Sequence, residues 1–165
     1  MCTIRSAAIF SFALIAAALM FPGDSLAQTS CPWMNAATAS GILGEPLIAT
    51  VSRADKTSGD ATCDFAPQHS AANAALHIEV ITMSAPGREF ATYTRQCVSK
   101  PILLKAIGNE AVECTQNSGP TQSVEVIGRV RNRVFLVNLR GADIPLADEL
   151  NKAKDVAEQV SETLY

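Results

Sequence analysis

Three groups of residues in this sequence have side chains that can do chemistry: two histidines, four cysteines after residue 30, and a set of closely spaced arginines. His77 lies two residues before Glu79, so on a strand both side chains share one face and the carboxylate can orient the imidazole as a general base. The alternative is a partly solvated polar pair on a sheet face. His69 precedes them in a polar segment, and two histidines without a spaced carboxylate signature do not define a metal site. We therefore predict no metal and no cofactor.

The arginines gather on one predicted hairpin. They are Arg129, Arg131, Arg133 and Arg140. Arginines two apart on a strand share a face, and their planar guanidinium groups match a carboxylate, sulfate or phosphate with two hydrogen bonds. The sequence therefore predicts a candidate ligand-binding site here, for an acidic protein or an envelope polyanion. The alternative is a solvated hairpin rim that keeps an exposed sheet edge from pairing with other chains.

The cysteines after residue 30 are Cys31, Cys63, Cys97 and Cys114. An even number of cysteines in an exported chain suggests two disulfides. Their intervals of 32, 34 and 17 residues lack the close pairs that a zinc site requires. Three pairings are open, and we favour Cys31 with Cys63 and Cys97 with Cys114, because short closures between neighbouring elements are the commonest.

The start of the chain has the pattern of a cleaved signal peptide over residues 1–27. Arg5 precedes an apolar run over residues 7–21, and small residues end the segment. We therefore predict a secreted or periplasmic protein with no membrane span in its mature form, and a single domain over residues 28–165. The 165-residue chain carries a formal net charge of −3. This mild acidity argues against nucleic acid as a partner, because such proteins need a basic surface.

The periodicity of apolar residues predicts the elements that position these groups. The predicted helices are 36–43, a segment that begins near Pro86 and ends at Lys100-Pro101, and a segment from Pro145 with one apolar stripe that reaches Leu164. The predicted strands are 46–54, 62–67, 74–83, 110–115, 123–131 and 133–139, and residues 102–107 are expected to be extended. On the third strand, Leu76 and Ile78 point one way and His77 points the other.

Hairpin connections between these strands, with helices interspersed, predict an α+β fold. We expect a mainly antiparallel twisted sheet of five or six strands, with three helices packed on it and two disulfides. Trp33, beside Cys31, is expected to be a core aromatic residue rather than a ligand-stacking one.

Several landmarks together resemble a group of exported bacterial domains of unknown function, many of them actinobacterial envelope lipoproteins. They are Cys31-Pro32-Trp33 before an Ala-rich helix, Cys63-Asp64-Phe65, the segment from Ile107 to Cys114, and the hairpin from Gly128 to Val134. The chain is also loosely similar to the extracellular sensor domains of some bacterial Ser/Thr kinases. The resemblance implies an exported binding or sensor-like domain and brings no catalytic residues. Polar residues 28–30 replace the lipidation tripeptide before Cys31, so we predict no lipid anchor.

These observations favour an exported, disulfide-stabilised, non-enzymatic binding or accessory domain of the cell envelope. A Gly-x-Ser-x-Gly nucleophile elbow and a phosphate-binding glycine motif are both absent from the sequence. The second hypothesis is a small exported hydrolase that uses His77 and Glu79. The third is a structural envelope component without a discrete ligand.

Overall fold

The computed structural model of the chain describes residues 30–68, 75–118, 121–141 and 144–165. The predicted signal peptide and His69 lie outside these residues. The helices are α1 (Ala36–Leu43), α2 (Pro86–Thr94) and α3 (Leu146–Leu164). The strands are β1 (Leu47–Asp55), β2 (Asp60–Pro67), β3 (Ala75–Thr82), β4 (Ile102–Leu104), β5 (Glu110–Ser118), β6 (Thr121–Val130) and β7 (Arg133–Arg140).

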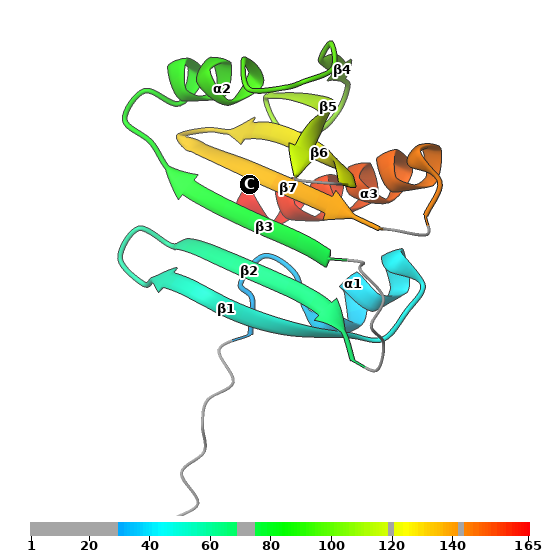
Figure 1. Ribbon diagram of the computed structural model, residues 1–165. Coiled ribbons are helices and arrows are strands. Elements are labelled where there is room, and N and C mark those ends of the chain that lie inside the picture. Colours follow the sequence, from blue (N-terminus) through cyan, green and yellow to red (C-terminus); the bar gives the residue numbers. More distant parts are fainter. Residues whose placement is uncertain (1–29, 69–74, 119–120, 142–143) are drawn as a thin grey trace, which may run out of the picture.

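The strands form one sheet in the order β1-β2-β3-β7-β6-β5-β4, and every neighbouring pair is antiparallel (Figure 1). The predicted α+β fold with three helices and two disulfides is confirmed. The predicted number of five or six strands is wrong, because the sheet has seven. The additional strand is the short β4, which pairs with Ala111, Val112 and Glu113 at the edge of the sheet.

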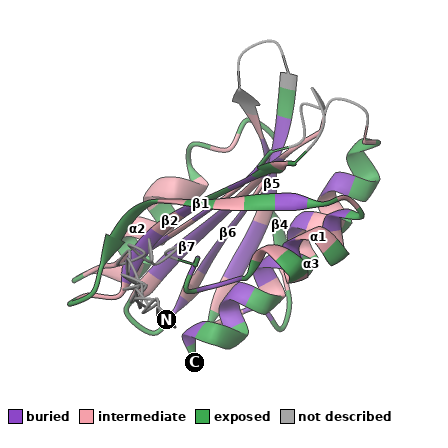
Figure 2. Cartoon of the chain, turned by 90° about the horizontal axis from the view of Figure 1, so that it is seen from below, coloured by how far each residue is buried: buried purple, intermediate pink, exposed green. Residues whose placement is uncertain are grey.

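The helices cover the two faces of the sheet unequally (Figure 2). Helices α1 and α3 lie on one face, where the main core contains Phe65, Ile78 and Phe135. Helix α2 lies on the other face and contacts β6 and β7, above a smaller apolar cluster. On this second face the side chains of Thr50 and Asp64, on β1 and β2, are exposed. Part of the second face therefore lies open beside α2.

Helix α3 presents the predicted apolar stripe to the sheet. Ala153, Ala157 and Val160 are fully buried, as alternating steps of three and four residues require. Leu146, expected at the start of this stripe, is exposed instead. Glu149 takes the buried position in the first turn, and its Oε1 accepts the Gly141 N–H at 2.6 Å.

Helix α2 ends earlier than the sequence predicts, at Thr94 rather than at Lys100-Pro101. Two tight turns follow the helix, and the Val98 N–H then donates to the Thr115 carbonyl at 3.0 Å. This bond to β5 draws the chain out of the helix, so Cys97 lies beyond it and bonds Cys114.

Both predicted disulfide pairings are confirmed. Cys31 bonds Cys63, and Cys97 bonds Cys114. Cys63 belongs to the core under α1 and α3, whereas Cys114 belongs to the cluster under α2. The two bridges therefore stabilise opposite faces of the sheet.

Candidate functional site

A row of mainly polar side chains crosses the second face of the sheet from its open part towards α2. The strand registers place these residues opposite one another in the order Thr50, Asp64, His77, Asn138, Glu125 and Cys114. Directly opposed side chains in an antiparallel sheet lie on the same face and within contact distance. Residues far apart in the sequence are therefore brought into one line.

The middle of this row lines an open hollow with a volume of about 430 Å³, which we call the polar hollow. Its lining residues are Asp64, Ala75, His77, Glu79, Glu125, Leu136, Asn138 and Arg140. The volume is in the range of sites that bind small molecules, and the lining includes three carboxylates, one imidazole and one guanidinium.

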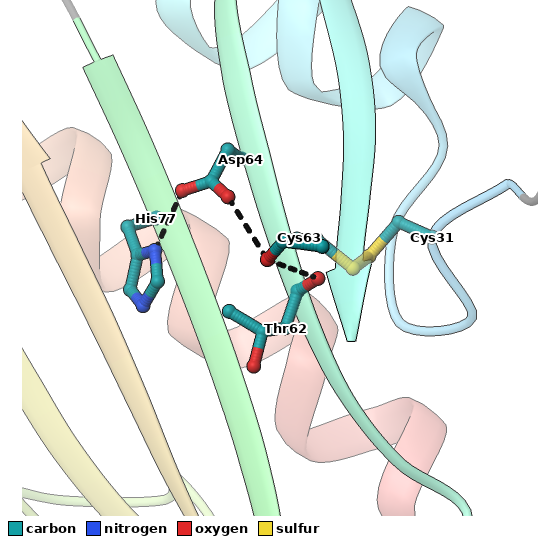
Figure 3. The surroundings of a disulfide bond; sticks show 6 residues. Cys31, Thr62, Cys63, Asp64 and His77 are labelled. Carbon is teal, nitrogen blue, oxygen red and sulfur yellow. Dashed lines mark hydrogen bonds and ion pairs between the residues drawn. A yellow bond between two sulfur atoms is a disulfide. The ribbon is translucent and has the colours of Figure 1, made fainter. Parts of the chain in front are cut away.

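His77 is oriented by a carboxylate at one side of the polar hollow (Figure 3). Its Nδ1 lies 2.7 Å from Asp64 Oδ1, and the Ser52 hydroxyl donates to Asp64 Oδ2 at 3.3 Å. Cys63 precedes Asp64 on β2 and points to the opposite face, where it bonds Cys31. The disulfide thus anchors the strand that carries Asp64. Among the described residues Nε2 of His77 has no hydrogen-bond partner, so it can contact a ligand.

The predicted common face of His77 and Glu79 is confirmed, since both residues line the polar hollow. The hydrogen-bond partner of His77, however, is Asp64 and not Glu79. Asp64 lies directly across the β2–β3 ladder, whereas Glu79 is two residues further along the same strand, a separation of about 7 Å. The opposed carboxylate is therefore the nearer one.

Glu125 is a half-buried carboxylate at the α2 side of the polar hollow. The Gln116 amide donates to Glu125 Oε2 at 2.6 Å. Burial raises the pKa of Glu125 above its ordinary value, while hydrogen bonds to Gln116 and Asn138 and the charge of His77 oppose this rise. Burial also raises the pKa of the Tyr93 phenol on α2, and the nearby carboxylates of Glu79, Glu89 and Glu125 raise it further. Negative charge therefore concentrates where the hollow approaches α2.

The raised pKa of Glu125 makes a pH-dependent contribution to stability. The folded state holds the Glu125 proton more tightly than the unfolded chain, so this contribution is present below the ordinary pKa of 4.5 and is lost as pH rises through the folded value. We expect Glu125→Gln to remove this loss. The free energy of unfolding of the variant minus that of the wild type should then increase as pH rises from 4 to 8, as measured by urea denaturation.

The control for this comparison is Asp155→Asn, at an exposed position on α3. Its difference from the wild type should stay nearly constant over the same pH interval. A Glu125→Gln difference that is flat, or that falls with rising pH, would contradict the assigned environment of Glu125.

Arg140 contributes the guanidinium of the polar hollow. The residue is partly buried, and its Nε is buried without a hydrogen-bond partner in the part of the chain that the structure describes. Within those residues the Arg140 side chain makes no hydrogen bond and no ion pair. A cationic donor that is removed from water without a partner costs free energy. An anionic group in the hollow would offset that cost.

The structure does not bring the other three predicted arginines to Arg140. Arg129 lies on the face that α2 partly covers and pairs with Glu110 at 2.5 Å. Arg131 is in the hairpin turn with φ = 54°, 5.9 Å from the centre of the Tyr165 ring.

Arg133 points to the face that α1 and α3 cover. Its guanidinium lies 5.4 Å from the centre of the Trp33 ring, and Nη2 donates to the Ser58 carbonyl at 3.3 Å. Arg133 is opposite Val130, so its side chain shares the face of Val130 and not that of Arg129. Trp33 is 8% exposed and belongs to the core, as expected.

The sequence analysis did not identify four residues of this site. Asp64, Glu125 and Asn138 belong to the polar row, and Gln116 donates a hydrogen bond to Glu125. Asp64, Glu125 and Asn138 each lie between apolar neighbours on a strand, and that alternation is the one signal that marks them in the sequence. Gln116 lies between two polar residues and lacks this signal. Alternation assigns a face to each residue, but it does not say which strands are neighbours.

Among the described residues, no three His, Cys, Asp or Glu side chains are grouped as metal ligands would be. None of the described helices combines the length and the apolar character needed to cross a membrane. The chain matches no protein-family model, and comparisons with curated proteins and with solved structures gave no significant match.

Proposed function

We propose that this protein is an exported, disulfide-stabilised, non-enzymatic binding domain that holds a small polar ligand in the polar hollow. The observation that carries the proposal is the partly buried Arg140 guanidinium, which has no partner among the described residues and lies in a hollow that also contains carboxylate, imidazole and amide groups. Such convergent polar groups in one concavity are the usual features of a ligand site. The two disulfides are compatible with export.

The surroundings of His77 favour binding over hydrolysis. The Asp64–His77 pair alone resembles the base of a hydrolase, in which a carboxylate orients an imidazole. The positions that border His77 on its own face are Thr62, Asp64, Ala75, Glu79, Leu136, Asn138 and Arg140. These described positions include no serine or cysteine nucleophile. Apart from Ala75 and Leu136, the residues that surround His77 are hydrogen-bonding or charged ones, which suit recognition.

Replacement of Arg140 by serine tests the proposed site. We expect Arg140→Ser to weaken ligand binding at least about tenfold, because a hydrogen bond to a charged group contributes roughly 1.5 to 3 kcal/mol. The measurement is saturation-transfer difference NMR of the oxidised protein with a mixture of small carboxylates, amines and amino acids. Arg88→Ser is the matched control, because it removes the same charge from an exposed position on α2.

Two outcomes decide the proposal. Saturation transfer to one or more mixture components that is lost in Arg140→Ser and retained in Arg88→Ser supports it. No transfer at millimolar concentrations, or transfer that both variants retain equally, would overturn the assignment of the polar hollow as the ligand site.

A further inference from the structure

We infer that the ligand of the polar hollow is a linear zwitterion, with an anionic group at Arg140 and an ammonium group at Glu79. This inference rests on the proposed function and names the class of ligand. Two observations support the inference: which charged groups in the hollow have partners within the protein, and where the charged groups without partners lie.

Most of the charged and polar groups in the hollow have partners inside the protein. Asp64 is bonded to His77 and to Ser52, and Glu125 is bonded to the amides of Gln116 and Asn138. Among the described residues, the charged side chains of the lining that make neither a hydrogen bond nor an ion pair are Arg140 and Glu79. The hollow thus offers one free cation and one free anion within that part of the chain.

The strand register sets the distance between these two free charges. Arg140 is opposite Ala75 on β3, and Glu79 lies four residues further along the same strand. At about 3.4 Å per residue, the backbone positions of the two residues are about 14 Å apart along the sheet. His77 and Asn138 face each other midway between them. A ligand that contacts both charges must therefore extend along β3 and β7, over His77 and Asn138.

This geometry distinguishes extended zwitterions from compact ones. The side chains of Arg140 and Glu79 are long and can shorten the gap from each side. Their backbone positions, however, belong to two cross-strand pairs that are separated by the His77–Asn138 pair. A compact α-amino acid, with its two charges on adjacent carbons, fits one charge at a time. An ω-amino acid with a spacer of several methylene groups reaches both.

A series of ω-amino acids provides the test. Isothermal titration calorimetry of the oxidised protein with glycine, 4-aminobutyrate and 6-aminohexanoate measures the effect of charge separation. We expect 6-aminohexanoate to bind at least tenfold more tightly than glycine. Hexanoate and hexylamine, which each keep one of the two charges, should also bind at least tenfold more weakly than 6-aminohexanoate.

Two variants assign the two ends of the probe. Arg140→Ser should reduce the affinity for 6-aminohexanoate to that for hexylamine, and Glu79→Gln should reduce it to that for hexanoate. Glu162→Gln, an exposed position on α3 at the opposite face of the sheet, is the control and should leave the affinity unchanged.

The outcomes separate this inference from the proposed function. If hexanoate binds as tightly as 6-aminohexanoate, and binding still depends on Arg140, the polar hollow remains a ligand site and the zwitterion inference is overturned. Equal affinity for glycine and 6-aminohexanoate would likewise overturn the required charge separation. If none of these probes binds, and the fragment mixture also gives no transfer that depends on Arg140, both proposals fail together.

Discussion

Removal of the Cys31–Cys63 disulfide by the double substitution Cys31→Ala and Cys63→Ala should lower the free energy of unfolding by about 4 kcal/mol. The bridge joins residues 32 positions apart, and its loss increases the conformational freedom of the unfolded chain. Cys63 is also fully buried in the main core, on the strand next to β3. The measurement is guanidinium denaturation monitored by the single tryptophan, Trp33.

The second bridge serves as an internal comparison. Cys97 and Cys114 are only 17 positions apart, so the corresponding double substitution should cost less, about 3 kcal/mol. A loss below 1 kcal/mol for the Cys31 and Cys63 variant would contradict the view that this bridge stabilises the fold. A larger loss for the Cys97 and Cys114 variant would show that loop length does not govern the difference.

The contact between Gly128 and Phe135 gives the other large expected effect. The two residues are opposite each other on β6 and β7, and Phe135 is fully buried. A Cβ atom at position 128 would lie 2.1 Å from Phe135 Cζ, so the aromatic ring occupies the space that a side chain there would need. Gly128→Ala should cost about 1 to 3 kcal/mol by overpacking. Phe135→Ala should cost about 3 to 5 kcal/mol by leaving a cavity.

The double variant tests whether the two effects share one cause. In Gly128→Ala combined with Phe135→Ala, the added methyl group enters the space that the ring has left. The total cost should therefore be smaller than the sum of the two single costs by at least about 0.5 kcal/mol, as measured in a double-mutant cycle by urea denaturation. Strict additivity would contradict direct packing of Phe135 against position 128.

Local patterns in the sequence were sufficient for much of the fold. The alternation of Leu76, His77 and Ile78 gave the correct face for each side chain of β3, because an exposed or a buried face imposes a period of two. The spacing of apolar residues by three and four positions on α3 likewise predicted which side of this helix is buried. The disulfide pairing followed from the proximity of elements that are neighbours in the sequence.

The order of the strands could not be predicted in this way. Strand β3 pairs with β7, although α2, β4, β5 and β6 lie between them in the sequence. Such long-range pairing depends on how the whole chain packs, and local periodicity carries no information about it. The short β4 was missed for a different reason: it pairs with the next strand, β5, but its three residues are too few for a period of two to show.

The candidate site depends on this same long-range pairing. His77 meets Asn138, and through it Glu125, only because β7 lies between β3 and β6. The predicted arginine cluster assumed that nearby arginines share a face, but the two-residue turn places Arg129 and Arg133 on opposite faces. Arg140 lies at the far end of β7 and is the one predicted arginine that lines the polar hollow.

Ligand binding in the polar hollow can be located by mapping which parts of the protein contact ligands. The measurement is a set of ¹H–¹⁵N correlation spectra of the labelled, oxidised protein, with and without the mixture of small carboxylates, amines and amino acids. We predict that the amides whose shifts move will cluster at Asp64, His77, Asn138 and Arg140. Shifts confined to another region, such as the pocket beside Trp33 and Gly59, or no shifts at millimolar concentrations, would contradict ligand binding in the polar hollow.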